Sequence, residues 1–255
     1  MNRPFTPLAG LAVFLLLLIG FGIYDVARNK RLDRSVMKRY FLGNGILTWV
    51  LSPFNTLLDV LSLPYVNKGV YRLEDLPVAH QNEINRLIEA AHGENLIAQL
   101  EERAREHART MVFFKWYGAN VAGGIRIPAF HERYRYVKTI GVSVFNKKQS
   151  TSKHFGPFRA TLRVLYNINP MEDDSAYIDV GDVRNFWRTQ PLFIFDDTLM
   201  HQSVNQSDKV RYCLFVDILR PSPFTPLLDI VVSGVRFFLR GVNYVFYKNW
   251  KVIEA

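Results

Sequence analysis

The first apolar run of the chain lies at its N-terminus. Pro4 to Tyr24 contains no charged residue, and its core from Leu8 to Ile23 is long enough, with its flanks, to cross a bilayer as a helix. A cleaved signal peptide is the alternative, but the run is long, the segment before it has a single basic side chain, and no small-x-small cleavage site follows. The pattern therefore predicts a transmembrane anchor over residues 1–25.

Basic residues follow this run and predict its orientation. They are Arg28, Lys30, Arg31, Arg34, Lys38 and Arg39. A basic flank stays on the cytoplasmic side of a membrane. We therefore expect a single-pass topology in which the N-terminus faces outward and the rest of the chain is cytoplasmic.

A second apolar stretch, from Phe41 to Tyr65, is interrupted by glycines, prolines and an aspartate, so a second crossing is not expected. We interpret residues 46–63 as an amphipathic segment that lies on the membrane or packs on the core, with a buried helix–turn pair as an equal alternative. From Leu73 to Thr110 the spacing of apolar positions is helical. Residues 26–110 are thus predicted to form a membrane-proximal, helical connector.

Short β-rich runs separated by polar turns begin at Tyr136. They cover Tyr136–Phe145, Ala160–Ile168, Ala176–Val180, Pro191–Phe195 and Tyr212–Leu219. Many short strands with turn signals are typical of a sandwich or a jelly roll. We predict a mainly β domain over residues 111–221, with helical additions before and after it.

The tail from Phe224 to Ile253 combines apolar and aromatic residues with interleaved cations, which are Arg236, Arg240, Lys248 and Lys251. We predict that residues 222–255 form an amphipathic C-terminal helix on the inner leaflet, where these cations meet anionic head groups. The alternative is a C-terminal helix that docks on the sheet.

Composition supports this layout. The chain has 255 residues, of which 49% are hydrophobic and 22% charged, as expected for a folded protein with membrane contact. A net charge of +9 suits either nucleic acid or an anionic membrane surface. No nucleic-acid-binding motif accompanies it, so the membrane explains the charge better. The single cysteine, Cys213, excludes an internal disulfide and is expected to be a small buried side chain in a strand.

Two of the six histidines lie at the edges of apolar runs and have polar companions. His154 stands in Lys-His-Phe-Gly-Pro, and His201 follows Phe-Asp-Asp-Thr-Leu-Met. Arg211 comes ten residues after the second histidine, inside a predicted strand. This is the ligand order of a non-haem iron oxygenase, in which open coordination positions let the iron bind oxygen. Spacing alone leaves open that both histidines are packed core residues.

The segment from Lys138 to Pro221 resembles the aspartyl/asparaginyl β-hydroxylase family of iron- and 2-oxoglutarate-dependent dioxygenases. The matching motifs, at fixed spacings, are His154-x-Gly156-Pro157, Leu162-Arg163, Phe195-Asp196-Asp197-x-x-x-His201, Arg211 and Asp217-Ile218-x-Arg220-Pro221. With the N-terminal anchor, the run Phe114-Lys115-Trp116-Tyr117-Gly118 makes the chain most similar to the membrane-bound branch, the lipid A acyl-chain hydroxylases of Gram-negative bacteria. That resemblance implies a double-stranded β-helix, a cupin-like jelly roll, with both histidines at its open mouth.

The resemblance also implies a cofactor and a co-substrate. His154 and His201 would ligate Fe(II). Arg211 would pair with the distal carboxylate of 2-oxoglutarate, which a planar guanidinium can bind through two parallel hydrogen bonds.

Other motif positions carry supporting roles or depart from the pattern. Ser143 and Arg163 fall where the family places further contacts to the co-substrate, and Asp197 would orient a ligand or an iron-bound water. Many iron oxygenases have an acidic ligand two residues after the first histidine, where this chain has Gly156. The family also commonly has a histidine where this chain has Leu165, which cannot donate a hydrogen bond to a carboxylate.

The function that the resemblance implies is a dioxygenase of the bacterial inner membrane, with its catalytic domain in the cytoplasm. It would use Fe(II), 2-oxoglutarate and O2 to hydroxylate a lipid acyl chain. The first expectation is the 2-position of a fatty acyl group of lipid A, and ornithine-containing lipids are a close second. Two alternatives stay open, namely hydroxylation of aspartyl or asparaginyl side chains in peptides and a non-catalytic lipid-binding or interaction module. The sequence defines neither the acyl chain nor an oligomeric state.

Overall fold

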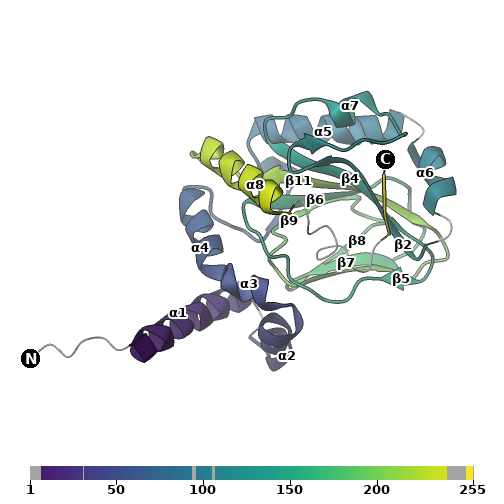
Figure 1. Cartoon of the computed structure of the whole chain (residues 1–255). Coiled ribbons are helices and arrows are strands. Elements are labelled where there is room, and N and C mark those ends of the chain that lie inside the picture. Colours follow the sequence, from purple (N-terminus) through teal and green to yellow (C-terminus); the bar gives the residue numbers. More distant parts are fainter. Residues whose placement is uncertain (1–6, 31, 94–95, 105–106, 240–250, 255) are drawn as a thin grey trace, which may run out of the picture.

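Two facing β-sheets form the body of the protein, and a long N-terminal helix projects from it (Figure 1). The computed structural model describes residues 7–30, 32–93, 96–104, 107–239 and 251–254. Helices cover the outer face of the larger sheet, and further helices lie where the N-terminal helix joins the domain (Figure 1). The predicted class, a mainly β fold with an N-terminal apolar helix and a C-terminal helix, is confirmed.

The strands of the described part of the chain divide into a sheet of eight and a sheet of four. The larger sheet contains β1 (Val70–Tyr71), β2 (Arg109–Trp116), β3 (Ala119–Asn120), β4 (Val137–Phe145), β6 (Thr161–Asn167), β9 (Leu192–Phe195), β11 (Arg211–Leu219) and β12 (Lys251–Glu254). The smaller sheet contains β5 (Gln149–Ser150), β7 (Ala176–Val180), β8 (Val183–Phe186) and β10 (His201–Asn205). Between β4 and β11 the chain passes repeatedly from one sheet to the other, as in a jelly roll.

Alternation along the central strands decides which residues face the space between the sheets. In β11, Leu214 and Val216 pack in the cluster beneath the covering helix, whereas Cys213 and Phe215 pack between the sheets. Successive side chains of a strand point to opposite faces, so Arg211 and Asp217 lie on the same inner face as Cys213. The register then places polar inner-face residues of neighbouring strands opposite one another, with Ser143 next to Cys213 and Arg163 next to Asp217.

The outer face of the larger sheet is covered by three helices of the connector and by α7, which follows β3 (Figure 1). They are η2 (Leu73–Asp75), α5 (Val78–Gly93), α6 (Leu96–Ala104) and α7 (Pro128–His131). Ile84 and Leu87 of α5 are buried against the sheet, as their helical spacing predicted. The helical pattern was expected to continue to Thr110, but β2 already begins at Arg109, because this segment pairs with β4.

The membrane-proximal region begins with α1 (Pro7–Ala27), which is followed by α2 (Arg34–Lys38), the π-helical η1 (Arg39–Gly43), α3 (Ile46–Val50) and α4 (Ser52–Leu61). Among the described residues, α1 is the one helix that is long and apolar enough to cross a membrane, with a hydropathy of 2.3. A single such helix is consistent with the predicted single-pass anchor. The second apolar stretch forms short helices that pack around the end of α1 (Figure 1).

The tail is helical over a shorter span than its pattern predicted. The helix α8 (Thr225–Leu239) docks on the domain through Leu228 and Val232. Residues 251–254 form β12, which pairs in parallel with β2, so the prediction of helix through Ile253 is wrong there. The predicted interfacial cations Arg240 and Lys248 lie outside the described residues.

Candidate active site

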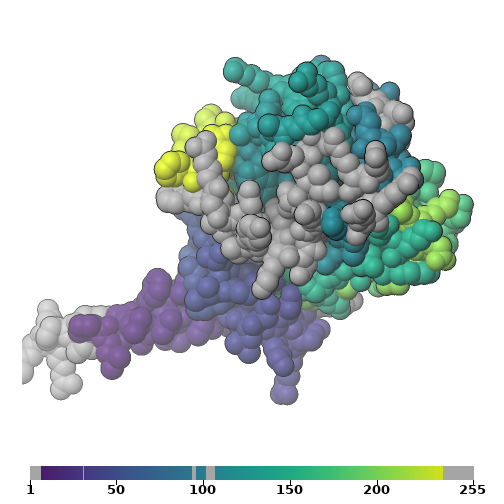
Figure 2. Space-filling view, turned by 45° about the vertical axis from the view of Figure 1, so that its right-hand side comes forward, coloured from purple at the N-terminus to yellow at the C-terminus, as the bar shows by residue number. Residues whose placement is uncertain are grey.

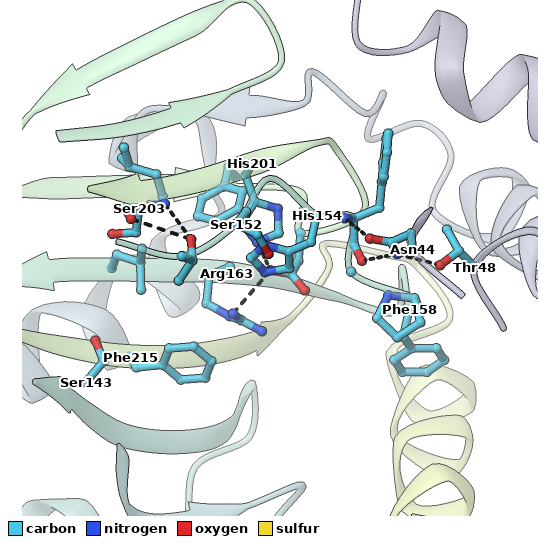
Figure 3. A pocket seen from close by; sticks show the side chains of 18 of the residues that line it. Asn44, Thr48, Ser143, Ser152, His154, Phe158, Arg163, His201, Ser203 and Phe215 are labelled. Atoms are coloured by element: carbon cyan, nitrogen blue, oxygen red, sulfur yellow. Dashed lines mark hydrogen bonds and ion pairs between the residues drawn. The ribbon is translucent and has the colours of Figure 1, made fainter. Parts of the chain in front are cut away.

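A short backbone pairing brings the two predicted histidines together. The amide of His154 donates to the carbonyl of His201 over 3.0 Å, and the amide of His201 donates to the carbonyl of His154 over 2.8 Å. The two imidazole rings lie side by side, with their centroids 4.2 Å apart (Figure 3). The loop before β6 and the start of β10, which are 47 positions apart in the sequence, therefore form one site.

Each imidazole has one nitrogen fixed by the backbone. Nδ1 of His154 lies 2.8 Å from the carbonyl oxygen of Ser152, and Nδ1 of His201 lies 2.8 Å from that of Leu199. Burial lowers the pKa of both histidines, and the neighbouring imidazole lowers the pKa of His154 further. Both rings are therefore neutral at physiological pH and donate from Nδ1, which leaves the lone pair of Nε2 for a ligand.

Arg211 is a buried cation that pairs with no acidic side chain among the described residues. Its side chain is 1% exposed, and one Nη donates to the hydroxyl of Ser203 over 2.7 Å. Its guanidinium lies against the rings of Phe145 and Trp187. Its Nε and other Nη have no hydrogen-bond partner in the part of the chain that the structure describes. Unpaired buried donors are costly, so this arrangement indicates a binding site for a carboxylate that the protein does not itself supply.

One cavity of about 540 Å³ contains both histidines and Arg211. Its inner wall comes from the facing strands and includes Ser143, Phe215 and Leu165. Its outer wall comes from the helical region and the loop after His154, and it includes Ile46, Leu47, Asn44 and Phe158. Figure 3 shows Asn44, Thr48 and Phe158 on one side of the histidines and Ser143 and Phe215 on the other.

Ser143 and Leu165 both lie in the wall of this cavity. The hydroxyl of Ser143 donates to the carbonyl of Cys213 over 3.3 Å. Leu165 is 7% exposed and packs with Phe215 and Phe193 in the core between the sheets. It therefore makes this wall apolar where the family commonly has a histidine.

Arg163 also lines the cavity, but its guanidinium already holds two carboxylates. It lies 2.7 Å from Asp217 and 3.2 Å from Asp197, and it stacks on the ring of Phe215. Burial alone would raise the pKa of Asp197, but Arg163 lowers it below its ordinary value. Asp197 is therefore an anion, and its Oδ1 lies 3.4 Å from Nε2 of His201.

The packing around Gly156 leaves no room for the acidic ligand that many iron oxygenases have at this position. A Cβ placed at Gly156 would lie 2.6 Å from the Cγ of Asp197 and 2.8 Å from its carbonyl oxygen. The amide of Gly156 also donates to that same carbonyl over 2.8 Å. The carboxylate of Asp197 thus fills the space that a side chain at position 156 would need.

We expect Gly156→Ala to displace Asp197 and to lower the affinity for Fe(II) by about 10- to 100-fold, the usual cost of disturbing a group that orients metal ligands. Metal titration of the purified protein measures this change. Gly93→Ala is the matched control, because a Cβ at Gly93 meets nothing within 4 Å. An unchanged iron affinity in Gly156→Ala would show that Asp197 does not act at the metal site.

The side chains at the site match the needs of an iron centre in their chemistry. They provide two neutral imidazoles and one carboxylate beside them. Arg211 has two N–H donors without a partner among the described residues, which could bind a dicarboxylate. Within the described residues, no group of three or more histidine, cysteine or acidic side chains is placed to hold a metal by itself. An iron ion held by His154 and His201 would take its other ligands from a co-substrate and water.

Two asparagines of the helical region hold the loop that follows His154. Asn44 pairs with both backbone groups of Phe155, at 2.8 Å each. Asn55 accepts from the amide of Arg159 and donates to the carbonyl of Pro157, at 3.0 Å each. These contacts join residues about a hundred positions apart, so the sequence pattern did not reveal them.

A buried ionic network joins the end of α1 to the loop that carries His201. It contains three arginines and three aspartates, which are Arg28, Arg159, Arg220, Asp25, Asp59 and Asp196. Arg159 is fully buried and pairs with Asp25 of α1 and, over 2.7 Å, with Asp59 of α4. Arg28 reaches Asp196, the neighbour of Asp197, over 2.6 Å. The helical region therefore helps to position both histidine loops.

Comparisons with known proteins show the family of the chain. A jelly roll with paired histidines and a buried arginine defines an oxygenase-like class of site. The family model of aspartyl/asparaginyl β-hydroxylases matches residues 80–221. The chain belongs to the aspartyl/asparaginyl β-hydroxylase family. It is also 35% identical over 80 residues to an "ornithine lipid ester-linked acyl 2-hydroxylase" of Rhizobium tropici, a match that covers 31% of this chain and only 28% of that protein.

Solved structures show partial likeness to the fold. An oxalate oxidase in complex with glycolate is 13% identical and has a TM-score of 0.31, with 55% of this chain and 76% of that chain covered. A cupin 2 conserved barrel domain protein from Salinispora arenicola is 10% identical and has a TM-score of 0.29, with 46% and 83% covered. The jelly-roll assignment itself rests on the topology of the two sheets.

Proposed function

We propose that the protein is a membrane-anchored Fe(II)- and 2-oxoglutarate-dependent dioxygenase that hydroxylates an acyl chain of a membrane lipid. The observation that carries this proposal is Arg211, a buried guanidinium with two unpaired donors in the same cavity as the His154–His201 pair. Family membership supports hydroxylation, and the relative from Rhizobium tropici supports a lipid acyl chain as its target.

The protein's own groups have separate tasks in this reaction. His154 and His201 would hold Fe(II) through Nε2, while their Nδ1–H groups donate to the backbone carbonyls of Ser152 and Leu199. Arg211 would bind the distal carboxylate of 2-oxoglutarate, and Arg163 holds the carboxylate of Asp197 near Nε2 of His201, where a metal would bind. When bound, iron and 2-oxoglutarate supply the activation of O2, so that one oxygen atom of O2 enters the C–H bond as a hydroxyl group and the other enters succinate, with release of carbon dioxide.

The apolar part of the cavity lining supports a lipid substrate. The wall beyond the histidines contains Ile46, Leu47 and Phe158, and part of it comes from the helices that pack around the end of α1. An acyl chain is apolar and needs such a wall. The proposal places the hydroxyl group at the 2-position of a fatty acyl group, either in lipid A, as the branch resemblance implies, or in an ornithine lipid, as in the named relative.

Mass spectrometry of lipids tests the proposal. Cells that express the wild type or the double variant His154→Ala/His201→Ala are compared for lipid A and for ornithine lipids. One added oxygen on an acyl chain, present only with the wild type, would support the proposal and identify the lipid. If neither lipid gains oxygen while the protein is folded and iron-loaded, hydroxylation of a peptide side chain becomes the better account.

We expect Arg211→Lys to weaken binding of 2-oxoglutarate, which raises KM for this co-substrate. Lysine keeps the charge but loses the planar pair of donors, so one charge-assisted hydrogen bond worth about 1.5–3 kcal/mol is lost, which corresponds to a rise of roughly 10- to 100-fold in KM for 2-oxoglutarate. Succinate formation at varied 2-oxoglutarate measures it. Arg184→Lys is the control, since Arg184 is an exposed residue paired with Asp179. An unchanged KM would remove Arg211 from the co-substrate site.

A further inference from the structure

Exposed apolar side chains gather on the helices around the point where α1 joins the domain. We call this surface the apolar collar and define it by Ile46, Leu57, Val60, Leu63, Leu227 and Ile230, which are between 42% and 68% exposed. It belongs to α3, α4 with the residues after it, and α8. Folded proteins rarely leave a contiguous apolar surface in water unless something covers it.

The contacts between α1 and the neighbouring helices indicate how deep the collar would lie in a membrane. Leu18, Gly22 and Val26 lie on one face of the last three turns of α1 and are buried. A Cβ at Gly22 would lie 2.6 Å from the ring of Phe41, so the π-helical segment packs directly against α1 at that level. A helix rises about 1.5 Å per residue, so Leu18 lies roughly 14 Å from the end of α1 at Ala27. If α1 crosses a bilayer, the helices that contact these turns reach the depth of its boundary.

The three parts of the collar belong to one packed unit. Leu58 of α4 and Leu228 and Val232 of α8 share a buried cluster with residues of the domain. The two helices therefore present their outer faces together, on the side of the sheets toward which α1 projects (Figures 1 and 2). Three exposed cations, Lys30, Arg34 and Lys38, follow the end of α1. Anionic lipid head groups would bind them there.

We propose that the apolar collar is embedded in the boundary between head groups and acyl chains of the leaflet in which α1 ends. The occupant of this surface is thus a lipid bilayer rather than a protein partner. The collar adjoins α1, whose own exposed side chains are apolar and whose length of 21 residues matches the hydrocarbon thickness, so the two form one continuous surface suited to a bilayer.

This position gives the cavity an entrance at the membrane surface. Ile46 belongs to the collar and also lines the cavity, together with Leu47 and Thr48 of the same helix. An acyl chain can therefore pass from the leaflet into the cavity along α3 without crossing water. This part of the inference rests on the proposed function, whereas the embedding of the collar does not.

Depth-dependent quenching in vesicles tests the embedding. In a full-length Cys213→Ala background, single cysteines are introduced by Leu57→Cys, Ile230→Cys, Leu16→Cys and Asp208→Cys and are labelled with an environment-sensitive fluorophore. The vesicles contain phosphatidylglycerol and phosphatidylcholine with brominated acyl chains. Leu16 lies on α1 and is 67% exposed, and Asp208 has a side chain 86% exposed on the loop between β10 and β11.

We expect bromine to quench the fluorophore at positions 16, 57 and 230 and to leave position 208 unchanged. Quenching at position 16 alone would overturn the proposal, because the collar would then face water. Absence of quenching at position 16 would overturn it too, because α1 would not span. The fluorescence does not depend on catalysis, so quenching without lipid hydroxylation would refute only the proposed function.

A second measurement links the collar to substrate entry. Leu57 and Ile230 lie outside the residues that line the cavity, so Leu57→Asp/Ile230→Asp leaves its walls intact. We expect this variant to lose lipid hydroxylation in vesicles and to recover it with the same lipid in detergent micelles. Equal rates of the wild type and the variant in vesicles would contradict entry from the leaflet.

Discussion

His201→Ala is expected to abolish lipid hydroxylation and to lower the affinity for Fe(II) by more than about 100-fold, since it removes a metal ligand rather than a group that only orients one. The reason lies in the geometry of the pair. Nδ1 of His201 donates a hydrogen bond to the carbonyl of Leu199. Its Nε2 lone pair therefore faces the site beside His154 and Asp197. Iron content after dialysis and oxygen gain on the lipid measure the two effects.

The control for this variant is His92→Ala. The imidazole of His92 interacts with the hydroxyl of Tyr166 on the outer face of the larger sheet and does not line the cavity. We expect it to keep its iron and its activity. If His201→Ala bound iron as well as His92→Ala while its circular dichroism spectrum stayed native, the ligand assignment would be wrong.

Arg159→Met should cause the largest loss of stability among single substitutions outside the core. The network around Arg159 contains three arginines and three aspartates, so removing one arginine leaves an uncompensated negative charge in a buried place. Burial opposes the charge of Arg159, but its aspartate partners raise its pKa, and the neighbouring arginines lower the pKa of Asp196 against its burial. Breaking such a buried pair costs about 3–5 kcal/mol.

The free energy of unfolding in detergent, measured with urea, tests this prediction. Arg184→Gln breaks an exposed pair with Asp179 and should cost no more than about 1 kcal/mol. Arg159→Met should also loosen the loop of His201 and so weaken iron binding, because Arg159 donates to the hydroxyl of Thr198. Equal stability of the two variants would show that the network does not hold the helical region to the domain.

Much of the fold was accessible from local patterns. Runs of alternating and β-branched residues predicted β4, β6, β7, β9 and β11 to within a residue or two, because these strands form the core between and above the sheets. Other elements had weaker signals. β1 and β3 are two residues long, and the strand assignment of residues 251–254 depends on pairing with β2, more than a hundred positions away.

The residues of the candidate site that belong to a sequence motif could be predicted. The residues that are placed only by tertiary packing could not. His154, His201 and Arg211 follow from spacing and resemblance, and the structure brings all three into one cavity. The contacts of Asn44 and Asn55 were not predictable, because no local pattern indicates which distant loop an asparagine will hold. The absence of an acidic residue at position 156 was visible in the sequence, but its steric cause was not.

The most direct test of the account follows the origin of the oxygen atom. Purified full-length protein is supplied with Fe(II), 2-oxoglutarate, the lipid identified in cells and ¹⁸O₂ in ordinary water. We predict that each hydroxylated acyl chain gains one ¹⁸O atom and that one labelled succinate is formed with it, with no product when 2-oxoglutarate is omitted. A hydroxyl group that carries oxygen from water, or that forms without 2-oxoglutarate, would contradict the proposed reaction.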